Sequence, residues 1–584
     1  MRTYTHGAGR SSRLHSTVYD IFDKRRSDCF DNLVAQSSSS DSAFDEFMSD
    51  KAQTVQDVHF VPLPTVRRPD PNKALDLIGF SRSAASLLNL DPSEKSTSDF
   101  LKTFSGADTT SSIPANPPFA SVYGCHCGDQ YFGQLGDGRA VTILETDSSN
   151  NGQRYEVQLK GSTTTPFSRG FDGRAALRGC IRELLGSEGL ASLGVPTQRV
   201  LSVIGTNDFI DRPWYRDDPT SSSSTTTSKF PPNKMISERA AVLTRFASSF
   251  LRFGHFEIHF MREEHELLKK LIIHSFKVEF PHLLSSTPPL DFDEQIKRFV
   301  NEVVDRQAKL VAEWLRVGYT QGNMNSDNTA IGGYTLDLGP FAFMEKYDRH
   351  FQPFTSDTMG RFSFTAQPSA VLLALQIWTT AVVSACDDEE IAGAVLGDVP
   401  KIFRERFMHH WTEVRKKKLG LSLWNPKSDQ QLWADLEELM SETPRGVDYT
   451  VLFARLSEVE DVGDLELKLF DAFYCFEGGG SLDKKWLLLW RDWVGCYCGR
   501  IRNEVPEDRA KIMTRSNPRI IPRNWMMYEC YTAAEESDLS LLEATMEALE
   551  SPYDEVSSGK HVDDRFLRRT PREYQDKPGL AFLS

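Results

Sequence analysis

The sequence is short of basic charge, and its cysteine content does not fit a disulfide framework. Lysine and arginine number 67 against 82 aspartates and glutamates, a net charge of −15 over 584 residues. Because a protein that wraps duplex nucleic acid needs a basic face, we expect no nucleic-acid partner. The nine cysteines are an odd number in a long chain without a secretory signal. This pattern favours free thiols in a reducing compartment.

Long hydrophobic runs are almost absent as well. One uncharged segment, residues 362–386, is long enough to span a bilayer. It contains Pro368, Gln376 and several hydroxyl side chains, so we predict a buried core helix and no membrane span. Two Cys-x-Cys pairs, at 125/127 and 496/498, could together bind zinc, but zinc ribbons usually separate their cysteines by two residues. We therefore expect buried thiols there.

The N-terminal region and one internal stretch are polar. Residues 1–50 include a serine-rich run and are predicted to be disordered. Their first part, MRTYTHGAGRSSRLHSTVYDIFDKRRS, has arginines and hydroxyl residues but no acidic residue before Asp20. This composition is typical of a mitochondrial transit peptide, with a plain disordered tail as the alternative, so we expect a mitochondrial or otherwise a cytoplasmic protein. The polar stretch 216–234 predicts a flexible surface insert.

Between these stretches the hydrophobic periodicity indicates strands first and helices later. YFGQLGDGRAVTILE predicts a strand, a glycine turn and a second strand, and RYEVQLKG alternates strictly. From about residue 255 the pattern is helical, with helices predicted at 264–276, 296–317, 368–386, 400–417, 429–441, 464–475, 484–500 and 536–550. The fold class is therefore α+β, with a β-rich part followed by a larger helical part.

A strand lysine and a helical glutamate form the first candidate pair. RYEVQLKG ends in Lys160, which is either a solvated edge residue or a phosphate anchor. The next segment, FDGRAALRGCIRELLGSEGLASLG, predicts a helix with Asp172 as its N-cap. Glu183 lies at the edge of the buried face, and a carboxylate there needs a cation. In this order, such a lysine and glutamate position nucleotide phosphates in protein kinases.

Two further segments supply groups that bind anions. In GQLGDGRA, the glycines let backbone amides approach an anion, and Arg139 adds positive charge. In ERAAVLTRFASSFLRFGHFE, Arg245 and Arg252 are seven residues apart, so on a helix they project from one face. Two arginines on a largely apolar helix of an acidic protein indicate an anion pocket. His255 and His259 could bind zinc from a helix, but the glutamate base of the zinc-protease motif is absent.

The stretch GNMNSDNTAIGGYTLDLGP, residues 322–340, carries hard oxygen ligands. Kinases hold their metal with an asparagine of the catalytic loop and the aspartate of D-F-G, and Asn328 and Asp337 match these two. Such ligands suit Mg²⁺ or Mn²⁺. The kinase base would stand five residues before the asparagine, where this chain has Asn323. The local acid is instead Asp327, directly before Asn328. The segment therefore predicts a metal that holds nucleotide phosphates, with a catalytic geometry that differs from that of protein kinases.

Over roughly residues 55–584 these strings resemble the selenoprotein O family of kinase-like protein adenylyltransferases. The segments that carry the resemblance are GQLGDGRA, QLKG, TPFSRGFDGRAALRGCIRELLGSEGLASLGVPT, LTRFASSFLRFGHFE, NMNSDN, DLGPFAFMEKYD, NPRIIPRN and SPYDE. The resemblance implies a two-lobed, protein-kinase-like fold. We expect an N-lobe with the nucleotide-binding elements at 51–255, a helical C-lobe with the metal loop at 256–500, and a C-terminal helical extension at 501–584.

The resemblance also implies a reaction and its residues. ATP binds inverted relative to kinases, and AMP passes to a Ser, Thr or Tyr hydroxyl of a protein substrate with release of pyrophosphate. The implied cofactor is Mg²⁺ or Mn²⁺, and the implied state is a monomer. Asn328 and Asp337 would bind the metal, Asp327 would accept the proton, and Glu183 would pair with Lys160. The implied nucleotide contacts are Gly136, Gly138, Arg139, Lys160, Asp172, Gly173, Arg245, Arg252 and Asp337.

The chain departs from the family at its C-terminus. It ends KPGLAFLS, without the selenocysteine or cysteine that many members carry, so redox control through that residue is not expected. Two alternatives stay open: uridylyl transfer from UTP on the same scaffold, and a silent pseudokinase that binds nucleotide. Catalysis is favoured over the pseudokinase because the chain has the full set of Lys160, Glu183, Asn328 and Asp337. Phosphoryl transfer is disfavoured because Asn323 stands where kinases have their base.

Overall fold

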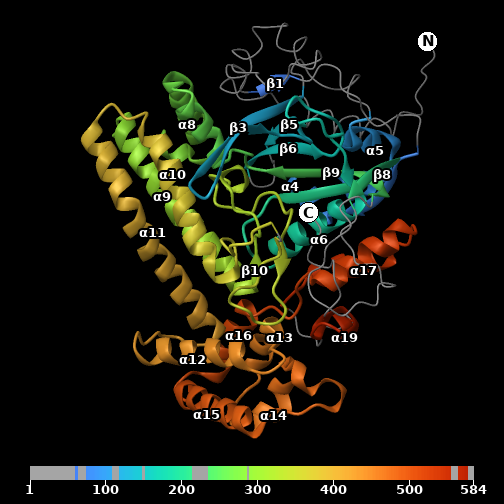
Figure 1. Ribbon diagram of the computed structural model, residues 1–584, viewed down its shortest axis with the longest axis vertical. Coiled ribbons are helices and arrows are strands. Elements are labelled where there is room, and N and C mark those ends of the chain that lie inside the picture. The colour runs from blue at the N-terminus through green and yellow to red at the C-terminus, as the bar shows by residue number, and fades with distance from the viewer. Residues whose placement is uncertain are drawn as a thin grey trace, which may run out of the picture.

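The computed structural model describes residues 60–62, 74–107, 118–147, 152–213, 235–285, 288–354, 356–553 and 563–575. The expected disordered or transit segment at 1–50 and the polar insert at 216–234 lie outside these ranges. The described chain is α+β: an antiparallel sheet with helices packed below and beside it (Figure 1).

Within the described residues, nine strands form the main sheet in the order β1-β3-β5-β6-β9-β8-β2, with β4 paired to β3 and β7 to β9. These strands are β1 (Phe60–Pro62), β2 (Asp76–Phe80), β3 (Phe119–Cys127), β4 (Gln130–Gly136), β5 (Ala140–Asp147), β6 (Arg154–Lys160), β7 (Ala175–Ala176), β8 (Arg199–Pro213) and β9 (Met235–Ala247). The strands predicted on either side of the glycine turn are confirmed as β4 and β5, although both pair with β3 rather than with each other. The strand RYEVQLK is confirmed as β6.

Most helices lie after residue 255, as predicted. The helices are α4 (Arg82–Leu87), α5 (Ser98–Ser105), α6 (Leu177–Ser192), α7 (Phe253–Met261), α8 (His265–Glu279), α9 (Phe292–Val317), α10 (Gln367–Val383), α11 (Glu389–Lys418), α12 (Ser428–Glu442), α13 (Tyr449–Leu456), α14 (Asp464–Lys468), α15 (Lys484–Ile501), α16 (Pro506–Ser516), α17 (Asn524–Glu535), α18 (Ser540–Leu549) and α19 (Arg572–Gln575). Among those after residue 255, α13, α16 and α17 lie where no helix was predicted.

Short elements complete the chain. A two-stranded ladder joins β10 (Tyr319–Thr320) to β11 (Ala342–Phe343), and the 3-10 turns are η2 (Pro92–Glu94), η3 (Pro281–Leu283), η4 (Ser326–Asn328), η5 (Phe364–Ala366), η6 (Leu469–Ala472), η7 (Tyr474–Gly479) and η9 (Asp564–Leu567). The predicted helix 464–475 is in fact α14 followed by η6. Helix α11 begins earlier than predicted because Asp388 caps the backbone amides of Glu390 and Ile391.

Two local predictions were wrong. Arg245 and Arg252 do not share a helix: Arg245 lies on strand β9, and Arg252 is the N-cap residue of α7. A short apolar run buried on both faces cannot be told from a buried helix by periodicity alone, and β9 is such a run. Asp172 is not a helix N-cap, since α6 begins at Leu177 after residues that pair with β9 as β7.

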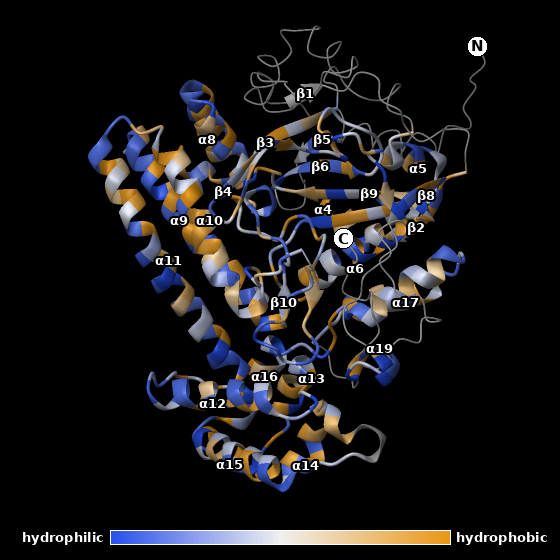
Figure 2. Cartoon of the chain, in the orientation of Figure 1, coloured by the Kyte–Doolittle hydropathy of each residue, from blue (hydrophilic) through white to orange (hydrophobic). Residues whose placement is uncertain are grey.

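Helix α10 is packed within the fold. The segment Phe364–Val383 is long and apolar enough to cross a membrane by length and composition, among the residues described. Its Trp378 stacks on Phe253 with ring centroids 5.0 Å apart, and Leu375 and Val382 are fully buried. Hydrophobic residues of α10 face α9 and α7, as expected of a core helix (Figure 2).

The C-terminal part of the chain supports α6. Helix α17 lies alongside α6 (Figure 1), and a Cβ atom at Gly189 would stand 2.8 Å from the ring of Pro522. Arg523, fully buried, donates to both carboxylate oxygens of Asp448 at 2.8 and 3.1 Å. The motif NPRIIPRN, residues 517–524, therefore contacts α6, the helix that carries Glu183, through Pro522 and pairs with Asp448 through Arg523.

Candidate active site

The predicted lysine–glutamate pair is present. Strand β6 runs between β5 and β9, which places Lys160 opposite Ala140 on one side and Leu243 on the other. Its Nζ lies 2.6 Å from Oε2 of Glu183 on α6. Glu183 is 3% exposed, and its second oxygen accepts a hydrogen bond from Gln198 at 2.7 Å. Both carboxylate oxygens are thereby satisfied, as a buried charge requires.

Asp337 is the centre of a cluster of cations. Its backbone adopts φ +50°, a left-handed conformation that few non-glycine residues take without a local reason. The carboxylate is bound by the guanidinium groups of Arg245 and Arg252 and lies 3.3 Å from Nζ of Lys160. Burial alone would raise the pKa of Asp337, but these cations outweigh it and hold the pKa well below its usual value. Asp337 is therefore ionised at neutral pH.

The two arginines reach Asp337 from different elements. Arg245 is 1% exposed, donates to Oε1 of Gln158 at 3.2 and 3.0 Å, and stacks over Phe250. The register of the sheet explains the first contact, because Gln158 and Arg245 are direct neighbours across β6 and β9.

Arg252 is 2% exposed and stacks over the ring of Tyr123, 4.7 Å from its centroid. It also donates to the backbone carbonyl of Asp327 and lies 3.5 Å from Asp137. Arg252 thus joins the glycine turn, the 322–340 loop and the Asp337 cluster. The two arginines expected to line an anion pocket therefore meet at Asp337, although they do not share the expected helix.

The loop 322–340 folds back on itself. Gly322 has φ +72°, and a Cβ atom there would stand 1.6 Å from the carbonyl oxygen of Pro340, so the close approach requires glycine. Asp327 and Asn328 lie in η4, where the backbone amide of Asn328 donates to Asn325. The loop therefore brings its two ends together beside Asp337.

The carboxyl of Asp327 is a weaker acid than usual. Burial is the main cause that raises its pKa above the usual value, while Arg252 and a hydrogen bond from Cys125 oppose the shift. Sγ of Cys125 donates to Oδ1 of Asp327 over 3.3 Å. Burial and the neighbouring Asp327 raise the pKa of the Cys125 thiol well above its usual value, so this thiol stays protonated and remains a donor.

The glycines of the first turn pack against the following loop. A Cβ atom at Gly136 would enter the ring of Phe167, and one at Gly138 would lie 2.9 Å from the Phe167 carbonyl. Gly173 has φ +67°, and its Cβ would lie 2.2 Å from the carbonyl of Thr163. These glycines hold the turn and the 163–173 loop close together.

Two predicted nucleotide contacts stand apart from the Asp337 cluster. Asp172 is exposed and pairs with Arg212, with both carboxylate oxygens 2.8 Å from guanidinium nitrogens. The Arg212 hydrogen bond is the main cause that lowers the pKa of Asp172. Arg139 is exposed, and its carbonyl accepts from the amide of Gly161, next to Lys160. Neither residue forms an ion pair with Asp337 among the described residues.

Several contacts were missed by sequence reasoning. Gln158 could have been found, because it shares a face of β6 with Lys160. Gln198, Cys125 and Asp137 carry no motif that marks them. A further missed contact is a clamp in which Glu257 accepts from Ser326 over 2.5 Å and lies 2.9 Å from Nδ1 of His126.

The expected metal ligands Asn328 and Asp337 both carry oxygen atoms, and those of Asp337 are held by three cations. Asp337 is ionised, and the side chain of Asn328 makes no hydrogen bond with the part of the chain that the structure describes. Oδ1 of Asn325 is buried and has no hydrogen-bond partner within the described ranges. No group of three or more His, Cys, Asp or Glu that could hold a metal occurs among the described residues. Two protein oxygens completed by phosphates and water are a usual Mg²⁺ arrangement.

Comparisons with known proteins show the family of the chain. The family model for "Protein adenylyltransferase SelO" matches residues 69–550. The protein nucleotidyltransferase YdiU of Xanthomonas oryzae is 33% identical over 519 residues, covering 88% of this chain and 93% of the relative. The YdiU proteins of Tolumonas auensis and Nitrosospira multiformis are each 34% identical, over 88% and 81% of this chain and 92% and 83% of their own lengths. The chain therefore belongs to the protein adenylyltransferase SelO family.

Proposed function

We propose that this protein transfers AMP from ATP to hydroxyl side chains of protein substrates and releases pyrophosphate. The observation that supports this most is the cluster in which Arg245, Arg252 and Lys160 surround Asp337. A kinase places a carboxylate base in its catalytic loop, whereas the corresponding position here is Asn323. The site therefore offers three cations that can bind phosphate, Lys160, Arg245 and Arg252, and lacks the kinase base.

The depth of the arginines suggests how the nucleotide enters. Arg245 and Arg252 are almost fully buried, and guanidinium groups bind phosphate oxygens in pairs of hydrogen bonds. A triphosphate that enters with its terminal phosphates toward these arginines leaves its α-phosphate nearer the surface. Gly136 and Gly138 keep the turn close to this path, with Arg139 and the Asp172–Gly173 loop at its outer side.

The transfer step needs a proton acceptor beside the incoming hydroxyl. The hydroxyl oxygen bonds to the α-phosphorus, and the bond from that phosphorus to the oxygen bridging to the β-phosphate breaks. The electron pair of that bond leaves with pyrophosphate, and the hydroxyl proton passes to Asp327. The raised pKa of Asp327 suits this role, because a base works best when its pKa is near the working pH.

A divalent cation fits the same site. Asp337 and Asn328 would hold Mg²⁺ or Mn²⁺, which would neutralise phosphate charge. Arg245 and Arg252 orient the phosphates from the other side. We also propose that the sheet-containing part and the helical part act as the two lobes of a kinase-like fold, at 51–255 and 256–500, with 501–584 as an extension and a monomer as the working unit.

Intact-mass spectrometry tests the proposed reaction. The protein is incubated with ATP and Mg²⁺ or Mn²⁺, in parallel with Asp337→Ala and with Asp398→Ala, an exposed aspartate on α11, as the matched control. We expect a mass increment of one AMP, or multiples of it, in the wild type and in Asp398→Ala and none in Asp337→Ala. An increment of one phosphate would make the protein a kinase. ATP binding without any mass increment would make the protein a pseudokinase. If UTP is supplied in parallel and UMP is added in preference to AMP, the protein is a uridylyltransferase.

A further inference from the structure

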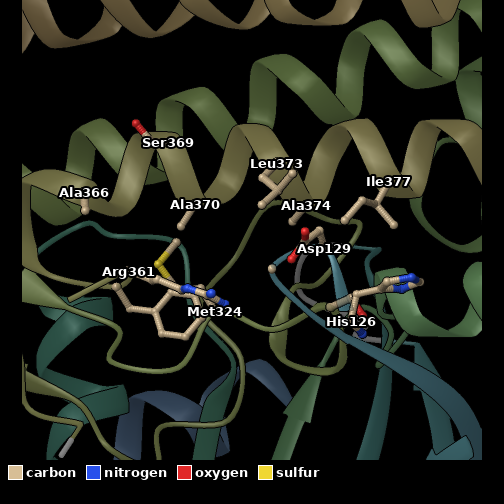
Figure 3. Close-up of a pocket in the computed structure, with 13 residues that line it drawn as sticks. His126, Asp129, Met324, Arg361, Ala366, Ser369, Ala370, Leu373, Ala374 and Ile377 are labelled. Carbon is tan, nitrogen blue, oxygen red and sulfur yellow. Dashed lines mark hydrogen bonds between the residues drawn. The ribbon is translucent and has the colours of Figure 1, made fainter. Parts of the chain in front are cut away.

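A cavity of about 410 Å³ opens beside the 322–340 loop. Its walls come from the turn between β3 and β4, from the loop itself, from the segment around Arg361, and from helix α10 (Figure 3). These four parts are distant from one another in the sequence or belong to different elements, so the cavity exists only in the folded protein.

One wall of the cavity is an apolar stripe of α10. Ala370, Leu373, Ala374 and Ile377 follow the spacing of one helix face and point into the cavity (Figure 3). Leu373 is 39% exposed although it lies in a helix whose other face is packed in the core. Met324 of the loop adds a second apolar surface. Such a concave apolar surface is typical of a site that binds an apolar group.

The cavity adjoins the proposed proton acceptor. Ser326 lines it, and the next residue in the chain is Asp327. Consecutive Cα atoms are about 3.8 Å apart, and an extended peptide advances about 3.3 Å per residue. A substrate hydroxyl at Asp327 therefore places a side chain two or three residues away within reach of the α10 stripe. The clamp of Ser326, Glu257 and His126 fixes this wall relative to Asp327.

Two charged residues stand at the rim of the cavity. Arg361 and Asp129 are exposed, and neither forms an ion pair with any residue that the structure describes. Arg361 lies over Gly128, where a Cβ atom would stand 2.9 Å from its guanidinium nitrogen. A guanidinium held at the mouth of an apolar cavity favours a carboxylate next to the apolar group.

We propose that this cavity binds the acceptor segment of the protein substrate. The segment presents a bulky apolar side chain, two or three residues from the acceptor hydroxyl, to the α10 stripe, and an acidic neighbour to Arg361. This inference rests on the proposed adenylyl transfer and adds a rule for choosing its substrates: hydroxyl residues near a leucine-like side chain and an acidic residue are preferred.

Synthetic peptides test the rule. Each peptide has one Ser, Thr or Tyr in a background of alanine, glycine and lysine, and a single leucine is moved through the positions on either side of the hydroxyl. A second series adds glutamate beside the leucine. The rate of AMP transfer is measured as kcat/KM with the wild type, Leu373→Asp, Ala370→Phe and Arg361→Glu. Leu488→Asp, an exposed leucine on α15, is the matched control.

We expect leucine two or three positions from the hydroxyl to raise kcat/KM by about tenfold or more over alanine, mainly through KM. Leu373→Asp and Ala370→Phe should abolish this preference, whereas Leu488→Asp should retain it and leave transfer to the leucine-free peptide unchanged. Arg361→Glu should reverse the preference for glutamate. Equal kcat/KM for leucine and alanine peptides, or a leucine preference retained in both cavity variants, would overturn the inference. If no peptide and no protein accepts AMP, the proposed function itself fails.

Discussion

Replacing Asp337 with asparagine keeps the shape of the side chain and removes the charge that three cations surround. In the wild type, Arg245, Arg252 and Lys160 all contact this carboxylate. The variant leaves Glu183 as the carboxylate in direct contact with Lys160 and Arg245. We expect the ligand-free variant to be less stable and to bind ATP without a divalent cation.

The magnitude follows from the burial of the site. Removing one partner of a buried ion pair costs about 3–5 kcal/mol. The Asp337 side chain is 20% exposed, which favours the lower end, about 3 kcal/mol. Phosphates can replace the missing carboxylate, so much of this loss should return on binding ATP. Each 1.4 kcal/mol recovered is about tenfold in affinity, which allows a gain of up to about 100-fold in the absence of metal.

Urea denaturation and calorimetric titration measure the two effects, with Asp398→Asn as the matched control. The pKa of Asp337 is lowered in the folded state, so its stabilisation is present above the unfolded value and is lost as the pH falls below about 3.8. The variant should lack this acid-dependent loss. Unchanged stability, together with ATP binding that still requires metal, would refute the reasoning.

Three further predictions concern single side chains. Cys125→Ala removes the thiol hydrogen bond that lowers the pKa of Asp327, so the acid limb of the kcat/KM profile should move to higher pH, while Cys125→Ser should restore it; equal profiles would contradict this. Gly138→Ala should cost about 1–3 kcal/mol in thermal denaturation because its Cβ meets a backbone carbonyl, and Gly179→Ala, which has open space, should not. Arg523→Met should cost about 3–5 kcal/mol by leaving a buried carboxylate unpaired, yet leave the KM for ATP unchanged where the protein stays folded.

The order of elements and much of the site followed from local pattern. Lys160 ends a strictly alternating strand and Glu183 lies on an amphipathic helix, so their types and positions were readable from the sequence. Asn328 and Asp337 stand in a polar, glycine-containing loop, where oxygen-rich residues are conspicuous. These signals depend on neighbours in the chain, which is why they could be predicted.

The features that could not be predicted from the sequence depend on contacts between segments that are distant in the chain. Arg245 looked helical because β9 is buried on both faces and has no alternation. Cys125 meets Asp327 across 202 residues of sequence, and no spacing rule indicates that contact. Asp172 resembled an N-cap, but the pairing of Ala175 and Ala176 with β9 delays the helix. Sheet register and tertiary packing determine where these residues lie, and neither can be read from local sequence.

The most direct test of the account uses ATP labelled at either the α- or the γ-phosphate, supplied in parallel with Mg²⁺ or Mn²⁺. Asp337→Ala serves as the control. The account predicts covalent protein label from α-labelled ATP alone, absent in the variant, with pyrophosphate released in proportion. Label retained from γ-labelled ATP alone would contradict it and would identify phosphoryl transfer instead.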